Sequence, residues 1–286
     1  MINQLSLLQE LIHRYKIGIG ICILLIINSI NGFAQYDDSA VYRTNKVKHI
    51  ESKVHFLQFK NSNDTCLFEV KEVNSKGLLT SIRQNYMCYG SQVLAETTFE
   101  YDAKDRVSVV TSTQNDNLIS QTKLAYNTVG KISREETKVI DPYLIQINTN
   151  QYFGPDKTPD SLITVQVNNA DTTRFKTTFT YEKGKQTRAE MVDLTNSQPV
   201  SKHVNKYDSK GRMVRDEFIL MQSYDNDDIT DFTYNEKGQI FKSQSEISKI
   251  AAEFYYDKKG LLLKTFYYNK FEALEREVWH KYTYWK

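Results

Sequence analysis

Apolar and polar residues alternate along most of the chain after residue 64, and this alternation predicts β-strands. Pairs of large apolar residues spaced by two enclose a polar residue, as in Phe99 and Tyr101 or Phe232 and Tyr234. A spacing of two places both members of a pair on the same face of a strand. The pattern therefore predicts antiparallel strands with one apolar face and one polar face.

A seven-residue segment follows most of these pairs and predicts a tight turn. Its clearest copy is YDSKGRM, at Tyr207–Met213. The Asp or Asn after the tyrosine can hydrogen-bond to its own backbone two residues on and start a turn. Glycine, or less readily Asp, supplies the positive φ that a hairpin turn with a bulge requires. The turn position holds Gly77, Asp105, Gly130, Gly184, Gly211, Gly238 and Gly260.

These segments form a repeat. The tyrosine position recurs every 22 to 29 residues from Val73 onward, once Tyr152 is taken as a degenerate unit. A fixed period in the twenties indicates a repeat array. Six of the eight glycines after residue 34 occupy the turn position, so chance placement does not explain the pattern. Residues 140–160 contain three of the four prolines, and they form either a long excursion or a kink in the sheet.

The repeat predicts an all-β fold built as one antiparallel β-meander. About nine hairpins correspond to about eighteen strands, and open twisted sheets rarely exceed about ten strands without curling or splitting. The apolar face must also be covered. We therefore expect a single sheet that curls on itself, as an open curled sheet or a partial shell, with the Phe-x-Tyr face inside.

The pattern Tyr-Asp-x-x-Gly-Arg at residues 207–212 resembles the YD or RHS repeats of bacterial surface and toxin proteins, over roughly residues 65–286. In that family the hairpins stack side by side into a long curling sheet, sometimes a hollow shell around a toxin. The resemblance implies a similar sheet here. The segment Asp141-Pro142-Tyr143-Leu144 lacks the Gly of the core motif of the large toxins, and no non-repeat cargo domain follows the array. We therefore do not expect toxin delivery.

Residues 1–34 have the features of an export signal. Basic residues Arg14 and Lys16 precede an apolar run over 17–27, and Gly32-Phe33-Ala34 forms a small-x-small cleavage site. The run is shorter than the roughly 20 residues of a membrane span, and an uncleaved interfacial anchor is the alternative. The sequence thus predicts a signal peptide over 1–34, an N-terminal cap or first strand within 35–64, and a repeat domain over 65–286. Cleavage would leave no transmembrane span and place the chain in the periplasm, on the outer membrane or outside the cell.

Charge and cysteine content limit the classes of function. The 286-residue chain has a net charge of +2, and without residues 1–34 it has 35 basic and 34 acidic residues. This balance predicts no nucleic-acid partner and no membrane-surface binding. Cys66 and Cys88 remain, and an oxidising compartment favours a disulfide. Pairing Val73 with Leu78 would leave Cys66 three residues short of Cys88, so the bond requires a bulge or a neighbouring strand. Two buried free thiols are the alternative.

The chain lacks the common catalytic motifs. It has no Gly-x-Ser-x-Gly, His-Glu-x-x-His, phosphate-binding glycine loop or Cys-x-x-Cys segment. His203 and His280 occupy equivalent positions, four residues before Tyr207 and Tyr284, so we interpret them as sheet-face residues of the repeat. We expect no enzyme activity, no cofactor and no metal site.

The C-terminal stretch is rich in aromatic residues, including Tyr267, Tyr268, Trp279 and Trp285. Exposed, these could stack on sugar rings or anchor a protein partner; otherwise they form the core of the last hairpins. The leading hypothesis is an exported, non-catalytic β-repeat protein that binds a protein partner or a glycan at the cell envelope. The alternatives are a structural or encapsulating RHS-type shell fragment, and an unrecognised hydrolase.

Overall fold

A computed structural model describes residues 39–57, 65–141, 144–155, 158–168, 171–221 and 227–286. The chain divides into two compact units, residues 1–40 and 41–286. The export signal expected over residues 1–34 lies outside the described residues. Among those that are described, no helix has the length and apolarity needed to cross a membrane.

The second unit is an antiparallel meander in which the eighteen described strands pair in sequence order. A short helix, α3 (Ser39–Thr44), precedes the first strand, and a 3₁₀ helix, η1 (Tyr86–Tyr89), follows the third. The strands are β1 (Val47–Phe56), β2 (Cys66–Val73), β3 (Leu79–Asn85), β4 (Leu94–Tyr101), β5 (Val107–Gln114), β6 (Asn117–Tyr126), β7 (Ile132–Asp141), β8 (Leu144–Phe153), β9 (Ser161–Asn168), β10 (Asp171–Glu182), β11 (Lys185–Asp193), β12 (Pro199–Tyr207), β13 (Met213–Leu220), β14 (Asp228–Tyr234), β15 (Ile240–Ser245), β16 (Ala251–Tyr256), β17 (Leu262–Tyr268) and β18 (Leu274–Tyr284).

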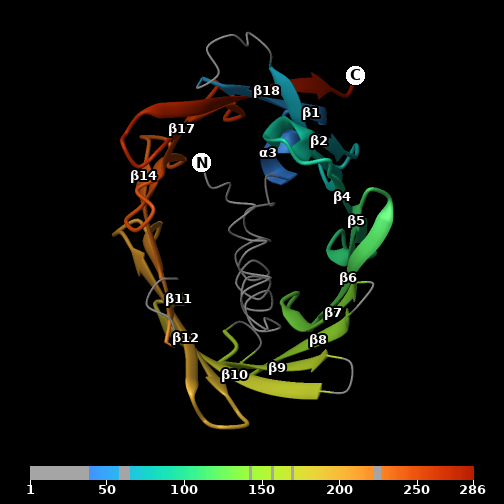
Figure 1. Cartoon of the computed structure of the whole chain (residues 1–286), viewed down its shortest axis with the longest axis vertical. Coiled ribbons are helices and arrows are strands. Elements are labelled where there is room, and N and C mark those ends of the chain that lie inside the picture. The colour runs from blue at the N-terminus through green and yellow to red at the C-terminus, as the bar shows by residue number, and fades with distance from the viewer. Residues whose placement is uncertain (1–38, 58–64, 142–143, 156–157, 169–170, 222–226) are drawn as a thin grey trace. The chain divides into compact units, whose positions relative to one another are not determined.

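The sheet closes into a barrel, so the open curled sheet or partial shell expected from the sequence is wrong (Figure 1). Strand β1 pairs with β18 from Val47↔Tyr284 to Phe56↔Arg276, and it pairs with β2 on its other side. Each described strand therefore has two neighbours. Closure pairs the N–H and C=O groups that an open edge would leave exposed. Residues 47–56, within the segment expected to hold a cap or first strand, form the strand that completes the ring.

The repeat turns share one hydrogen-bonding scheme. Asp208 Oδ1 accepts from the backbone N–H groups of Lys210 and Arg212, at 2.9 Å each, and Gly211 follows with φ +75°. The same side-chain scheme recurs at Asn74, Asp102 and Asp257. Asp105 holds the turn position of its own copy with φ +59°. The remaining turn residues also have positive φ, between 76° and 84°, at Gly77, Gly130, Gly184, Gly238 and Gly260.

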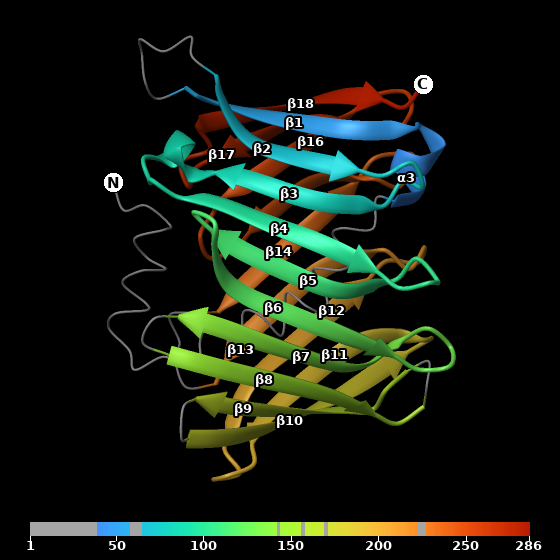
Figure 2. The ribbon, with the colours of Figure 1, turned by 90° about the vertical axis from the view of Figure 1, so that its right-hand side faces the viewer.

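These turns gather at one end of the barrel. In a meander, every return from an even-numbered to the next odd-numbered strand lies at the same end, which we call the repeat-turn end (Figure 2). One further copy, Tyr268–Leu274, joins β17 to β18 at the opposite end. Asn269 Oδ1 accepts from the N–H groups of Phe271 and Ala273, and Glu272 takes φ +59°. This copy was not predicted, because Glu272 replaces the glycine and Tyr268 follows Tyr256 by only 12 residues.

The inner face of the barrel is apolar near the repeat-turn end. Tyr42 of α3 belongs to a buried cluster with Val73, Leu79 and Phe99, and Tyr101 packs against it. Figure 1 shows α3 within the ring of strands. The Phe-x-Tyr face therefore points inward, where aromatic burial contributes most to stability.

The buried side chains on β7, β8 and β9 include a polar group. Asn150 donates to Glu135 Oε2 at 3.4 Å, Thr164 donates to Asn150 Oδ1 at 2.8 Å, and Gln146 donates to Asn148 Oδ1 at 2.9 Å. All five residues are buried. The hydrogen bonds offset the cost of removing these groups from water.

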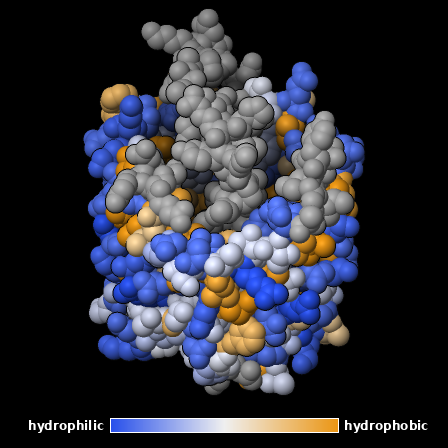
Figure 3. All heavy atoms as spheres, turned by 60° about the horizontal axis from the view of Figure 1, so that its bottom comes forward, coloured by the Kyte–Doolittle hydropathy of each residue, from blue (hydrophilic) through white to orange (hydrophobic). Residues whose placement is uncertain are grey.

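The outer face carries charges along the strands. Arg134 forms an ion pair with Glu136 on β7, and Lys206 of β12 pairs with Glu217 of β13 at 2.7 Å. Figure 3 shows one side of the molecule, on which hydrophilic residues predominate.

Candidate functional site

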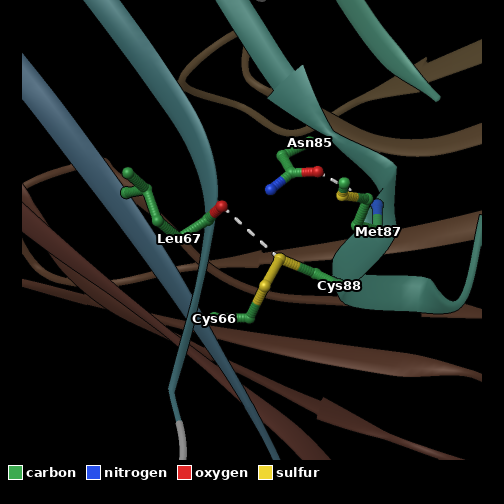
Figure 4. Close-up of a disulfide and its surroundings, with 5 residues drawn as sticks. All are labelled: Cys66, Leu67, Asn85, Met87 and Cys88. Atoms are coloured by element: carbon green, nitrogen blue, oxygen red, sulfur yellow. Dashed lines mark hydrogen bonds between the residues drawn. A yellow bond between two sulfur atoms is a disulfide. The ribbon is translucent and has the colours of Figure 1, made fainter. Parts of the chain in front are cut away.

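The two cysteines of the repeat domain are joined in a disulfide with a Cα–Cα distance of 5.6 Å (Figure 4). A bulge between Glu72 and Val73 shifts the β2–β3 register so that Glu69 pairs with Gln84, and the η1 helix then brings Cys88 to Cys66. Asn85 caps this helix by accepting a hydrogen bond from the N–H of Met87, and the chain turns back over β2. The bond lies at the end opposite the repeat turns and has a structural role.

Repeat tyrosines tie successive hairpins together. Their hydroxyl groups donate to the backbone carbonyl of the first residue in the return strand of the preceding hairpin. This contact spans the inner face near the repeat-turn end, so one hairpin positions the next. The donor and acceptor pairs, at 2.6 Å, are Tyr101 and Leu79, Tyr126 and Val107, and Tyr234 and Met213. In the last unit the donor is Tyr282, two residues before the tyrosine position, and it bonds to Leu262 at 2.8 Å.

An arginine immediately after the turn position fills the space between neighbouring repeat turns. The Arg106 guanidinium lies 4.2 Å from the ring centroid of Tyr126, and that of Arg212 lies 4.5 Å from the ring of Tyr234. Asp102 holds Arg106 through its carboxylate at 2.5 Å. That hydrogen bond lowers the pKa of Asp102 to about 2. The planar guanidinium group stacks on the tyrosine ring, and this cation–π contact stabilises the packing between neighbouring repeat turns.

Gln239 replaces the arginine in the Tyr234 repeat, and a groove of about 380 Å³ is present there. Its amide donates to the carbonyl of Gly260 in the next turn, at 3.2 Å. Strands β15 and β16 pair from Lys242↔Glu253 to Gln244↔Ala251, so they separate toward the repeat-turn end. We call this the Gln239 groove. It is lined by Asn235, Glu236, Lys237, Gln239, Phe241, Phe254, Tyr255, Tyr256 and Asp257.

A row of aromatic side chains continues from the groove across the outer faces of β15 to β18; we call Phe241, Tyr255, Phe266 and Trp279 the aromatic row. The ring centroids of Phe241 and Tyr255 are 6.2 Å apart, and those of Tyr255 and Phe266 are 5.1 Å apart. Lys264 Nζ lies 3.5 Å from the ring centroid of Trp279. Phe241, Tyr255 and Trp279 are 40%, 38% and 42% exposed, so the row is an accessible aromatic surface.

Carboxylates hold the rings in place. Glu253 accepts from the hydroxyl groups of Tyr255 at 2.9 Å and Tyr268 at 3.1 Å, and Glu277 accepts from the Trp279 indole N–H at 3.1 Å. Burial, followed by the hydrogen bond to Glu253, raises the pKa of Tyr268 to about 12. Each carboxylate has capacity for further donors, such as ligand hydroxyl groups.

The aromatic residues singled out in the sequence separate in the structure. Trp279 belongs to the row and Tyr268 borders it. Tyr267 points to the inner face, where the Arg276 guanidinium lies 4.4 Å from its ring and burial raises its pKa. Trp285 follows β18, and Lys48 Nζ lies 5.0 Å from its ring. Phe266 belongs to the aromatic-rich C-terminal stretch, whereas Phe241 and Tyr255 were not predicted, because only strand register brings them beside it.

The described part of the chain contains no group of three or more His, Cys, Asp or Glu residues placed to hold a metal ion. His203 is buried on the inner face and hydrogen-bonds to Asp216. His280 bonds to Ser52 on the closing strand, at 2.9 Å. The two histidines thus make separate structural contacts, on β12 and β18.

No protein-family model and no curated protein matches the chain. Among solved structures, a porin-like protein from Bacteroides uniformis ATCC 8492 is similar at 12% identity and a TM-score of 0.46, covering 84% of this chain and 97% of that one. The TcdB2-TccC3-Cdc42 complex is similar at 9% identity and a TM-score of 0.32, covering 73% and 16%. TcdB2-TccC3 without its hypervariable C-terminal region is similar at 11% identity and a TM-score of 0.28, covering 82% and 14%. This chain therefore spans less than a fifth of those toxin chains. These likenesses carry no conclusion about function, and the YD/RHS resemblance stays a hypothesis.

Proposed function

We propose that the chain is an exported, non-catalytic barrel protein that binds a glycan in the Gln239 groove and along the aromatic row. The observation that carries this proposal is a groove with aromatic rings and polar turn residues that opens onto further exposed rings. The C–H faces of sugars pack against aromatic rings, and their hydroxyl groups hydrogen-bond to amide and carboxylate side chains.

Groove size favours a glycan over a protein partner. A volume of about 380 Å³ lies within the range of small-molecule sites, roughly 300–1,000 Å³. Asn235, Gln239 and Glu236 place both hydrogen-bond donors and acceptors around the rings. A protein partner remains the competing candidate, because exposed aromatic residues are also common anchors of protein interfaces.

The groove carboxylates support a binding role. Asp257 lines the groove, but its Oδ1 accepts from the backbone N–H groups of Lys259 at 2.8 Å and Leu261 at 2.9 Å. Asp257 therefore stabilises the repeat turn. Among the residues that line the groove, Glu236 is then the one remaining carboxylate. Hydrolysis of a glycosidic bond generally requires two such groups. Export rests on the signal features of residues 1–34.

The test is a substitution that fills the groove. Gln239→Arg introduces the residue that covers the next tyrosine in two other repeats, and it should lower the affinity for a glycan selected on an array by at least tenfold. Trp279→Ala should weaken binding of longer oligosaccharides. Lys131→Arg, which places an arginine at the equivalent position of another repeat, is the control and should bind like the wild type. An array without a ligand, or unchanged binding by Gln239→Arg, would refute the proposal.

A further inference from the structure

A second groove lies between the repeat turns of β10–β11 and β12–β13, with a volume of about 860 Å³. The ladder between β11 and β12 extends from Val192↔Pro199 to Arg188↔Val204, so the strands separate toward the repeat-turn end. The Tyr181 repeat is one residue short, and Lys185 stands where two other repeats have arginine. Its ammonium group lies 5.4 Å from the ring centroid of Tyr207, so it bridges the turns less closely than those arginines do.

Positive charge dominates this groove. Its lining includes five basic and three acidic residues. Arg188 is paired with Glu190, Lys206 with Glu217, and Asp208 with Arg212. The three remaining lysines of the lining are Lys183, Lys185 and Lys202. Among the described residues, no carboxylate oxygen lies close enough to their nitrogen atoms to form an ion pair.

Of the three acidic residues that line the groove, Glu190 and Asp208 are in ion pairs and Glu182 is not. Three lysine ammonium groups outside ion pairs are therefore accompanied by one such carboxylate. A concave wall with such an excess attracts anions and raises their local concentration. The other groups in the groove suit a sugar chain. Tyr207 offers an aromatic ring, and Thr180, Thr187 and Ser209 offer hydroxyl groups.

We propose that this lysine groove binds an anionic polysaccharide, whose hydroxylated rings carry repeated carboxylate or sulfate groups. Lysine ammonium groups act as point charges and do not require the planar geometry that arginine matches. Single-stranded nucleic acid fits less well, because its binding surfaces stack successive bases on several aromatic side chains. Tyr207 is the sole aromatic residue among those that line this groove. Binding here does not depend on ligand binding in the Gln239 groove.

The experiment compares polygalacturonate, dextran sulfate, neutral dextran and single-stranded DNA as probes, in low and high salt. The wild type should bind at least one anionic polysaccharide, with an affinity that falls as salt rises, and should not bind neutral dextran. Combined substitution of Lys183, Lys185 and Lys202 by Gln should reduce binding at least tenfold. A control with the same change in net charge, Lys104, Lys123 and Lys138 to Gln, should leave binding unchanged.

The probes and variants separate a defined polysaccharide site from general attraction of anions. A preference for polygalacturonate or for dextran sulfate identifies the anionic group, and either result supports the proposal. Equal losses in both triple variants would show attraction by net charge alone and overturn it. DNA bound as tightly through the same lysines would also overturn it. Gln239→Arg should retain polyanion binding, which separates this site from the aromatic groove. If the triple variant melts early, Lys183→Glu at the exposed turn should give the same loss.

Discussion

Gly77 and Gly238 occupy the same turn position with the same φ of +81°, yet they should respond differently to alanine. A Cβ added at Gly238 would meet no atom within 4 Å. A Cβ at Gly77 would lie 2.6–2.7 Å from the Cβ, Cα and N atoms of Arg43, which belongs to α3. Arg43 Nε also donates to the carbonyl of Lys76 at 2.7 Å, so the helix and the turn are held together.

The expected magnitudes follow from these two environments. Placing a non-glycine residue in the left-handed region costs about 1–2 kcal/mol, and both variants incur that cost. Gly77→Ala adds an overlap with backbone atoms, and overpacking typically costs about 1–3 kcal/mol more. We therefore expect Gly238→Ala to lower the free energy of unfolding by about 1–2 kcal/mol and Gly77→Ala by about 2–5 kcal/mol.

Urea unfolding, followed by tryptophan fluorescence and by circular dichroism, measures both losses. Asparagine separates the two contributions, since it tolerates positive φ but still carries a Cβ. Gly238→Asn should recover most of the stability lost in Gly238→Ala, whereas Gly77→Asn should remain strongly destabilised. Equal destabilisation by alanine at the two positions would show that α3 does not pack against this turn, and the prediction would be wrong.

Three further predictions concern the contacts that join hairpins. Tyr126→Phe removes a hydroxyl group bonded to Val107 and should lower the free energy of unfolding by roughly 0.5–1.5 kcal/mol in chemical denaturation. Tyr255→Phe is the control, because its hydroxyl group lies on the outer face. An equal loss of stability in both variants would contradict the role of the inner-face bond. Reduction of the disulfide, or Cys66→Ser with Cys88→Ser, should lower stability by about 2–4 kcal/mol, and identical melting with and without reductant would exclude the bond. Burial lowers the pKa of His280 from 6.5 to about 4, so the unfolded chain takes up a proton that the folded chain does not as pH falls over this range. Stability should therefore decline from pH 6.5 toward 4, and His280→Gln should reduce that slope.

Local structure was largely determined by the sequence. The turn at Asp208–Gly211 forms within seven residues, because a carboxylate oxygen accepts two nearby backbone N–H groups and glycine takes the positive φ. Alternating polarity likewise decides which face of a strand is apolar. The copy at Tyr268–Leu274 escaped recognition because Glu272 adopts a conformation in which glycine is much commoner.

Closure of the barrel and the candidate sites were decided by tertiary structure alone. Pairing of Val47 with Tyr284 joins residues at opposite ends of the described chain, and no local pattern encodes it. The Gln239 groove depends on which side chain lies beside Tyr256, 17 residues later in the sequence. The aromatic row takes one ring from each of four strands. Short-range hydrogen bonds and polarity set turns and strands, whereas register and closure set which distant side chains meet.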